Sequence, residues 1–203
     1  MNYQREMEKT LEGLEGTPSL MLHSCCGPCS TAVIAVLSSF FKITVLYYNP
    51  NIDDRAEYEK RAREQERLIA MMPTPNPVAF LEGEYDPEEF LSFARDRADD
   101  PEGGDRCTLC YGLRIERTAL EAKKAGCDYF TTTLSLSPMK DAKRINALGD
   151  ALGKKHGVAW LWSDFKKKNG FLKSIELSRE YGLYRQDFCG CSFSRRKADR
   201  ILP

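Results

Sequence analysis

Residues 19–49 read SLMLHSCCGPCSTAVIAVLSSFFKITVLYYN, and this stretch decides the fold. Two short apolar runs rich in β-forming residues, at 19–24 and 42–49, flank a stretch of helical character. The helix is expected to open with the Gly-Pro pair and to continue to residue 40, because proline is favoured in the first turn of a helix. The pattern predicts a β-α-β unit with parallel strands.

The same alternation continues along the chain. Further helices are expected at 55–72, 86–98, 109–124 and 137–155, and further strands at 77–81, 128–133 and 158–162. Five strands alternating with helices predict a single α/β domain with a mostly parallel, doubly wound sheet of the Rossmann-like or HUP-like kind. This domain is expected to span residues 19–203 and to end in a basic, helical, cysteine-containing segment, whereas residues 1–18 form a polar N-terminal extension.

The composition excludes several classes of protein. The chain has 203 residues, of which 42% are hydrophobic and 30% are charged, the balance of a chain that buries a core and is not disordered. Its longest apolar stretches are shorter than the roughly 20 residues that a membrane span needs. The N-terminal stretch is polar and lacks the apolar region of a secretory signal. We therefore expect a cytoplasmic protein with no membrane partner.

Eight cysteines are present, and in a reducing cytoplasm they are expected to bind metal or to act in catalysis. Seven of them fall into three short clusters, whereas Cys127 stands alone and is expected to be a small buried residue. The clusters are Cys25, Cys26 and Cys29 in HSCCGPCS, Cys107 and Cys110 in DRCTLCY, and Cys189 and Cys191 in DFCGCSF. The first cluster follows the first predicted strand, where sheets of this kind bind their ligands.

The first two clusters are compatible with more than one chemistry. Cys26-Gly-Pro-Cys29 matches the C-x-x-C of thioredoxin-type dithiols at a helix N-terminus, where the pKa of a thiol is lowered. Cys107-x-x-Cys110 has a metal-binding spacing, and with the two C-terminal cysteines it could form a closed Cys₄ zinc site. That zinc site leaves the first cluster unexplained, whereas an iron–sulfur cluster takes thiolates from several segments. Spacing alone does not separate zinc from iron.

Three other motifs have two interpretations each. A disulfide across the single residue of Cys189-Gly-Cys191 would be strained and redox-active, and the same two thiolates could instead bind metal. His23 could tune the site, although a satisfied core histidine is the expected role. The hydroxyls in TTTLSLS (131–137) could cradle a phosphate, or Ser137 could cap a helix.

The charge is unevenly distributed along the chain. Residues 1–139 hold 15 Lys and Arg against 23 Asp and Glu, whereas residues 140–203 hold 15 against 7. The net charges of the two parts are therefore −8 and +8. A basic C-terminal third suits a phosphate-bearing partner such as a nucleic acid.

Five motifs in this order and spacing resemble the epoxyqueuosine reductase family QueH: HSCCGPCS, DRCTLCYGLRIERTA, DYFTTTLSLSPMK, SDFKKKNG and YRQDFCGCSFS. The resemblance extends from about residue 20 to residue 195. It implies an oxidoreductase that removes the epoxide oxygen of epoxyqueuosine in tRNA by a two-electron reduction, the last step of queuosine biosynthesis. An external electron donor is implied, and the sequence does not identify it.

The resemblance also implies cofactors and their ligands. The family uses a [4Fe–4S] cluster with a second iron beside it. The cluster ligands carried over by motif are Cys25, Cys26, Cys107 and Cys110. Cys189 and Cys191 match a C-x-C pair assigned to redox catalysis or to the second metal, for which Cys29 is a further candidate ligand. The alternatives are a zinc-stabilised RNA-binding module and a dithiol oxidoreductase.

The resemblance gives the basic C-terminal third a specific partner, tRNA that carries epoxyqueuosine. Two groups of basic residues are expected to contact its phosphates at the rim of the site. They are Lys166, Lys167 and Lys168 after the last predicted strand, and Arg195 and Arg196 after the C-x-C motif.

Overall fold

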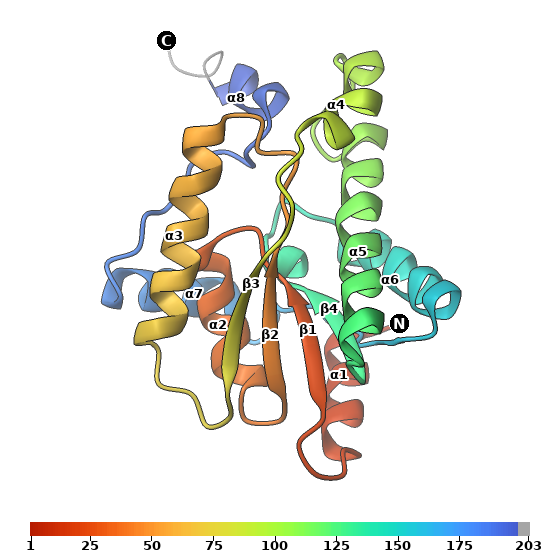
Figure 1. The fold of residues 1–203 in the computed structure, drawn as a ribbon, viewed down its shortest axis with the longest axis vertical. Helices are drawn as coiled ribbons and strands as arrows, with labels where there is room; N and C mark the ends of the chain where they lie inside the picture. The colour runs from red at the N-terminus through yellow and green to blue at the C-terminus, as the bar shows by residue number, and fades with distance from the viewer. Residues whose placement is uncertain (199–203) are drawn as a thin grey trace.

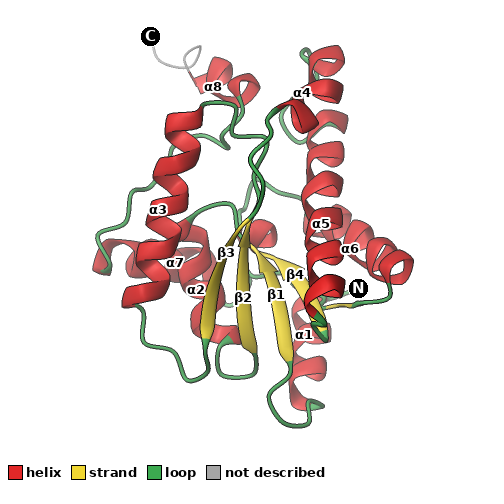
Figure 2. Cartoon of the chain, in the orientation of Figure 1, coloured by secondary structure: helices red, strands yellow, loops and turns green. Residues whose placement is uncertain are grey.

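The computed structural model describes the chain from residue 1 to residue 198 and its side chains to residue 195. It forms a sheet of five parallel strands in the order β3-β2-β1-β4-β5 (Figures 1 and 2). The strands are β1 (Ser19–His23), β2 (Lys42–Tyr47), β3 (Val78–Glu82), β4 (Tyr129–Thr132) and β5 (Ala159–Trp160). This order is Rossmann-like, and the predicted fold class is confirmed.

Helices connect the strands and cover both faces of the sheet. They are α1 (Tyr3–Glu12), α2 (Gly27–Leu37), α3 (Arg55–Met71), α4 (Glu88–Ala94), α5 (Asp105–Ala125), α6 (Ala142–His156), α7 (Gly170–Glu180) and α8 (Ser192–Ala198), with short 3₁₀ helices η1 (Arg95–Arg97) and η2 (Thr133–Leu136). None of the helices among the described residues is long and apolar enough to cross a membrane.

The central strand β1 is buried on both sides, as its nearly continuous apolar sequence predicts. Leu20 and Leu22 belong to one core cluster with residues of α1 and α2, and Met21 belongs to another with residues of α5 and α6. Successive side chains of a strand point to opposite faces, so the two clusters are the two faces of the sheet. Helix α7 packs beside α2, and α3 packs against α2 and β3.

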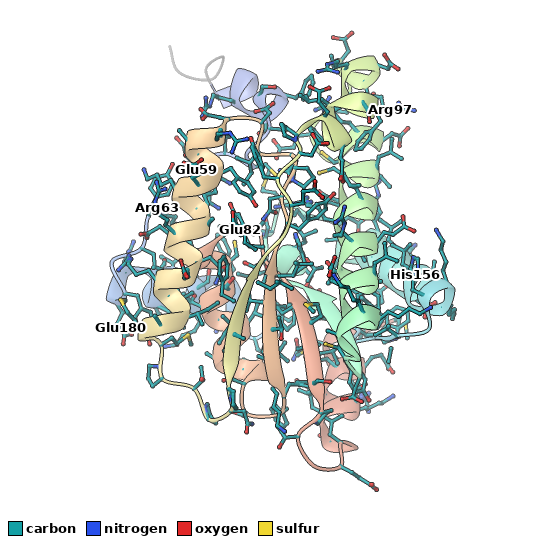
Figure 3. The ribbon with its side chains drawn as sticks, viewed as in Figure 1. Glu59, Arg63, Glu82, Arg97, His156 and Glu180 are labelled. Carbon is teal, nitrogen blue, oxygen red and sulfur yellow. The ribbon has the colours of Figure 1, made fainter. Side chains whose placement is uncertain are left out.

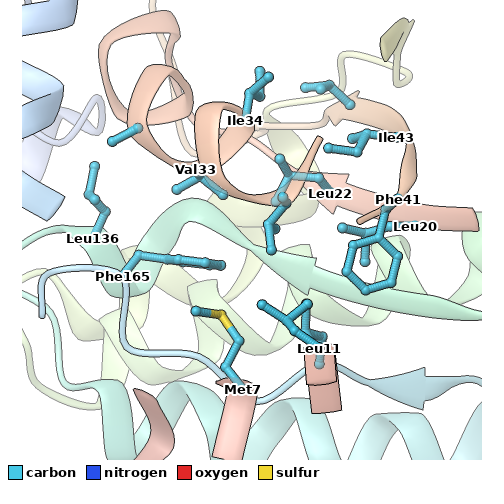
Figure 4. Packing of buried hydrophobic residues seen from close by; sticks show 14 residues of the cluster. Met7, Leu11, Leu20, Leu22, Val33, Ile34, Phe41, Ile43, Leu136 and Phe165 are labelled. Atoms are coloured by element: carbon cyan, nitrogen blue, oxygen red, sulfur yellow. The ribbon is translucent and has the colours of Figure 1, made fainter. Parts of the chain in front are cut away.

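Helix α1 lies within the segment that the sequence indicates as a polar extension. Its side chains Met7 and Leu11 are buried, 2% and 9% exposed, in the same cluster as Leu20 and Phe165 (Figure 4). Asn2 begins the helix by accepting a hydrogen bond from the backbone N–H of Arg5. Two apolar residues four apart in a polar sequence are therefore sufficient to dock this helix on the core.

Several helix boundaries differ from the prediction. Helix α2 ends at Leu37, not at residue 40, and α4 spans Glu88–Ala94, not residues 86–98. Helix α5 begins at Asp105, not at residue 109, because Asp100 accepts the backbone N–H of Arg106 at 2.8 Å and supports an earlier first turn. Helix α6 begins at Ala142, not at residue 137, because Asp141 is its N-cap and accepts the N–H groups of Lys143 and Arg144. Strand β5 is confined to Ala159–Trp160.

The carboxyl ends of all five strands meet at one edge of the sheet, shown uppermost in Figure 1. The turn after β1, the start of α5 and helix α8 gather at this edge. The C-terminal cysteine segment is only partly helical, because Cys189 and Cys191 lie in the loop that precedes α8. The predicted cysteine clusters thus lie at the edge where the fold predicts a site.

Candidate metal and redox centre

The first three clustered thiols come from the turn between β1 and α2. Cys26 is the N-cap of α2, Cys25 precedes it, and Cys29 lies in the first turn. The three Sγ atoms lie within 4.8 Å of one another. Thiolates bound to one metal at about 2.3 Å would lie about 3.8 Å apart in a tetrahedral arrangement, so this trio is close to the geometry of ligands that share a single ion.

The other four clustered thiols line one small cavity. Cys107 and Cys110 come from the first two turns of α5, and Cys189 and Cys191 come from the loop before α8. Cys110 and Cys191 are buried, and the other two are partly exposed. Four thiols around one hollow are the number of ligands of a closed Cys₄ zinc site or of one iron–sulfur cluster.

A larger cavity of about 420 Å³ adjoins the thiols, and Cys25, Cys29 and Cys189 line it together with the rings of Phe171 and Phe188. Cys189 borders both cavities. The volume lies in the range of small-molecule sites, which combine apolar walls with a few polar groups. The seven thiols therefore form one continuous site with room for a ligand beside them.

Gly190 allows the two C-terminal cysteines to face the site from one short loop. Its φ is +126°, in the region that favours glycine. A Cβ at this position would lie 2.8 Å from Cγ1 of Ile52 and 3.3 Å from Nη1 of Arg61. The glycine of the C-x-C motif is thus required both for its backbone conformation and for its close packing.

Helix α3 and the loop before it hold the C-terminal cysteine segment by its backbone. Arg61 donates to the carbonyls of Cys189 and Phe188 at 3.2 and 3.4 Å, and it is paired with Glu57 at 2.6 Å. Asp53 accepts the N–H of Ser192 at 3.0 Å. These contacts hold the segment with Cys189 and Cys191 in place. The groups that make them lie more than 120 residues earlier in the sequence.

Buried positive charge surrounds the thiols. Arg114 is 1% exposed and donates from Nε to the carbonyl of Cys110, while its Nη2 has no hydrogen-bond partner in the described structure. Arg106 lines the same small cavity, and its Nε is also unpartnered. Unpaired donors are costly when buried, so these two guanidinium groups make the four-thiol cavity suited to a group that carries negative charge.

The thiols of the first trio share protons unequally. Cys26 and Cys29 hydrogen-bond to Cys25 and lower its pKa well below its usual value, and the positive charges of Lys140 and Arg114 act in the same direction. The same hydrogen bond raises the pKa of Cys26 to about 12. In the second group, burial raises the pKa of Cys110 to about 12. Cys25 is therefore the thiol of the trio that ionises first.

Lys140 faces the larger cavity, which it helps to line. Burial opposes its charge, but electrostatic interaction with Cys189, Cys25 and Cys29 outweighs burial and raises the pKa of Lys140. Its ammonium group therefore remains positive beside the thiols.

Comparison with known proteins identifies the chain. A sequence model of the family described as epoxyqueuosine reductase QueH matches residues 20–197. The chain belongs to the QueH family. The epoxyqueuosine reductase QueH of Streptococcus pyogenes serotype M1 is 39% identical over 201 residues, which cover 97% of this chain and 79% of the relative. The protein of that name from Thermotoga maritima is 38% identical over 180 residues, which cover 87% of this chain and 90% of the relative. The resemblance stated from the motifs is confirmed.

The QueH match includes all seven clustered cysteines and excludes helix α1. Cys127 also lies within it but is distant from the site, because it precedes β4 at the amino-terminal edge of the sheet. It is partly buried and packs against the core, close to its expected role.

His23 is satisfied within the core, as expected. Its Nδ1 lies 2.7 Å from Oγ1 of Thr132, its Nε2 lies 3.2 Å from the carbonyl of Tyr48, and burial lowers its pKa to about 3. The hydroxyls of the TTTLSLS motif are likewise engaged. Thr131 donates to the carbonyl of Leu161, and Thr132 accepts the N–H of Leu134. These two hydroxyls therefore serve the fold.

The basic residues expected to contact tRNA occupy different surroundings. Lys166 is paired with Asp164 at 2.8 Å and Lys168 with Glu8, whereas Lys167 is exposed. Arg195 lies 3.7 Å from Asp54 and stacks over the ring of Phe188 at 4.4 Å. The side chain of Arg196 lies outside the described residues.

Sequence reasoning missed several residues of the QueH site. Arg114 follows Cys110 by four residues, so the helical spacing could have placed it beside that thiol. Lys140 is the last residue of the motif DYFTTTLSLSPMK, but no pattern in the neighbouring sequence indicates that it lines the site. No sequence pattern indicates the role of Arg61, because the carbonyl groups that it contacts lie at the other end of the chain.

Proposed function

We propose that this protein reduces epoxyqueuosine in tRNA to queuosine, the final step of queuosine biosynthesis. The observation that carries the proposal is the convergence of seven thiols from three segments at one edge of the sheet, beside a cavity of about 420 Å³. Relatives that are 39% identical to this chain over 97% of its length are named epoxyqueuosine reductase. Both the arrangement and the relatives support an oxidoreductase.

We further propose that the thiols carry a [4Fe–4S] cluster and a second iron. The donor set fits these groups, because seven soft thiolates exceed the four that one cluster uses. The buried, unpartnered nitrogens of Arg114 and Arg106 support an anionic group in the four-thiol cavity. When bound, the cluster would supply electrons, and an open iron would act as a Lewis acid toward the epoxide oxygen.

Two assignments of the ligands remain as proposals. The resemblance implies that Cys25, Cys26, Cys107 and Cys110 hold the cluster, with Cys29, Cys189 and Cys191 left for the second iron or for redox catalysis. The geometry favours another grouping, in which the four thiols of α5 and the C-x-C loop hold the cluster. The trio within 4.8 Å would then hold the single iron.

Iron and acid-labile sulfide in anaerobically purified variants distinguish the two assignments. Both assignments predict that Cys107→Ser and Cys110→Ser lose iron and sulfide together. The first predicts that Cys189→Ala and Cys191→Ala keep the sulfide but lose turnover, and the second predicts that they lose the sulfide as well. If Cys107→Ser and Cys110→Ser both keep wild-type iron and sulfide, neither assignment holds.

The chain's own residues would orient the substrate and stabilise the departing oxygen. Conversion of the epoxide to an alkene consumes two electrons and two protons and releases the oxygen as water. Lys140 places a positive charge in the cavity, where negative charge develops on that oxygen. Phe171 and Phe188 give the wall of this cavity apolar surface against which a modified base can pack.

The activity is tested by incubating epoxyqueuosine-containing tRNA anaerobically with iron-reconstituted protein and dithionite, which replaces the unidentified electron donor. Mass spectrometry of the digested nucleosides should show queuosine in place of epoxyqueuosine. Protein reconstituted with zinc should not convert it. Absence of queuosine with fully iron-loaded protein would overturn the proposed function.

A zinc-stabilised RNA-binding module is the second candidate, because Cys107, Cys110, Cys189 and Cys191 also form a closed set that zinc could occupy. The metal content decides between the two. A brown, sulfide-containing protein supports the reductase, whereas a colourless protein with one zinc and no sulfide supports the binding module.

A further inference from the structure

An open groove of about 840 Å³ lies beside the thiol site, between α1, the segment before α6 and the loop that follows β5. Six basic side chains line it: Arg5, Lys140, Lys143, Lys166, Lys167 and Lys168. Only three acidic side chains do so: Glu8, Asp141 and Asp164. The groove therefore carries an excess of positive charge.

All three acidic side chains of the groove have partners within the protein. Asp164 is paired with Lys166, and Glu8 is paired with Lys168. Asp141 caps α6 by accepting two backbone N–H groups. Four cations are then left without a carboxylate partner among the described residues. They are Arg5, Lys140, Lys143 and Lys167.

Lys140 connects the groove to the thiol site, because it lines both the groove and the larger thiol cavity. An extended polyanion in the groove would therefore pass the entrance of the cavity that holds Cys25, Cys29 and Cys189. A nucleic-acid strand has this form, with phosphates along the chain and bases that can turn into a pocket.

Helix α1 forms a fixed wall of this groove. The ring of Tyr3 stacks on the ring of Trp162, with ring centroids 5.7 Å apart and an angle of 3° between the ring planes. Met7 and Leu11 of the same helix are buried in the core. The ion pair between Glu8 and Lys168 adds a link across the groove. Arg5, on this docked helix, is consequently held at a defined place.

We propose that this groove binds the RNA backbone of the substrate next to the modified nucleotide, with α1 as one wall and the four unpaired cations as phosphate contacts. This rests on the proposed function for the identity of the RNA. Helix α1 lies outside the part of the chain that the family model matches. Helix α1, which the family motifs do not contain, would thus take part in substrate binding.

The test is a titration of labelled tRNA at several salt concentrations with the triple variant Arg5→Ala, Lys143→Ala, Lys167→Ala. This variant keeps both ion pairs of the groove and leaves Lys140 beside the thiols. Each lost phosphate contact should flatten the slope of log K against log salt by about 0.7 to 0.9, so the slope should change by about 2 to 3 units. The control variant Lys42→Ala, Lys123→Ala, Lys124→Ala removes three charges at the opposite end of the sheet and should keep the wild-type slope.

The role of α1 is tested separately with single variants of that helix. Arg5→Ala should flatten the slope by about 0.7 to 0.9. Lys9→Ala removes a 60% exposed cation of the same helix that does not line the groove, and it should leave the slope unchanged. Equal slopes for Arg5→Ala and the wild type would remove α1 from the interface.

Failure of the groove proposal is distinguishable from failure of the proposed function. If the wild type converts epoxyqueuosine but the triple variant keeps the wild-type slope and KM for tRNA, only the groove proposal is wrong. If the wild type binds tRNA through these residues but does not convert it, the binding groove stands and the reductase proposal falls.

Discussion

At the scale of single residues, Gly190 determines whether the C-x-C thiols can face the site. Gly190→Ala places a Cβ 2.8 Å from Ile52 and requires a φ of +126° from a residue that rarely adopts it. We expect a loss of about 1–3 kcal/mol in the free energy of unfolding and a loss of iron, because the loop must move away from Ile52 and Arg61.

The matched control is Gly182→Ala, at a φ of +57° with no atom within 4 Å of the added Cβ. It should lose about 1–2 kcal/mol from the left-handed backbone alone and keep wild-type iron. Urea unfolding and iron analysis of both variants provide the measurement. Wild-type iron in Gly190→Ala would show that the position of this loop does not determine metal binding.

The sequence predicts the cysteines of the site but not the cations beside them. All seven clustered cysteines lie where the strand ends predict a site, because their spacing places them after β1, at the start of α5 and before α8. Arg114 and Lys140 were missed, because their role depends on which thiols surround them in the folded protein.

At the scale of elements, α3 holds the C-terminal cysteine segment, and Arg61 is the central contact. Arg61→Met removes its bonds to the carbonyls of Phe188 and Cys189 and leaves Glu57 buried without its cation. We expect a loss of about 3–5 kcal/mol in the free energy of unfolding and reduced turnover. The control is Arg63→Met on the outer face of α3 (Figure 3), 69% exposed, which should cost less than about 1 kcal/mol. Equal losses in the two variants, measured by urea unfolding, would contradict this role of Arg61.

Glu64 makes a second contact between α3 and the C-terminal segment, and this contact depends on pH. It accepts hydrogen bonds from Arg67 and from the N–H of Tyr184, and chiefly the bond from Arg67 lowers its pKa below the ordinary 4.5. Because the folded-state pKa is the lower one, the stabilisation is complete above the unfolded-state pKa and is lost as pH falls through the folded-state pKa.

Glu64→Gln should therefore be less stable than the wild type near neutral pH, and the difference should shrink below about pH 4.5. Urea unfolding near neutral pH and below about pH 4.5 provides the measurement. Glu66→Gln, an exposed neighbour on α3, is the control and should change stability little at either pH. A difference for Glu64→Gln that stays constant with pH would contradict the assignment.

The elements themselves could mostly be predicted, since hydrophobic periodicity gave all five strands and the helices between them. The boundaries of α5 and α6 were wrong because Asp100 and Asp141 determine them through side-chain hydrogen bonds to the backbone. The role of α3 could not be predicted, because its partners lie more than 110 residues further along the chain.

At the scale of the whole molecule, bound metal should link three distant segments, residues 25–29, 107–110 and 189–191. A ligand that binds only the folded state stabilises it by about 4 kcal/mol at a free concentration of about 1,000 times its Kd. For a chain of this size, that corresponds to a rise in Tm of roughly 8–16 °C. Anaerobic calorimetry of metal-loaded and metal-free protein should show this difference. Equal Tm values would mean that the metal does not hold the three segments together.

The central claim is that the seven clustered thiols form one reductase site. It is tested most directly by measuring queuosine formation in epoxyqueuosine-containing tRNA with each of the eight cysteines replaced in turn by serine, under one anaerobic assay. We expect Cys127→Ser to convert the substrate like the wild type and each of the other seven variants to lose most of the wild-type turnover. Wild-type turnover in variants of any one cluster would contradict it.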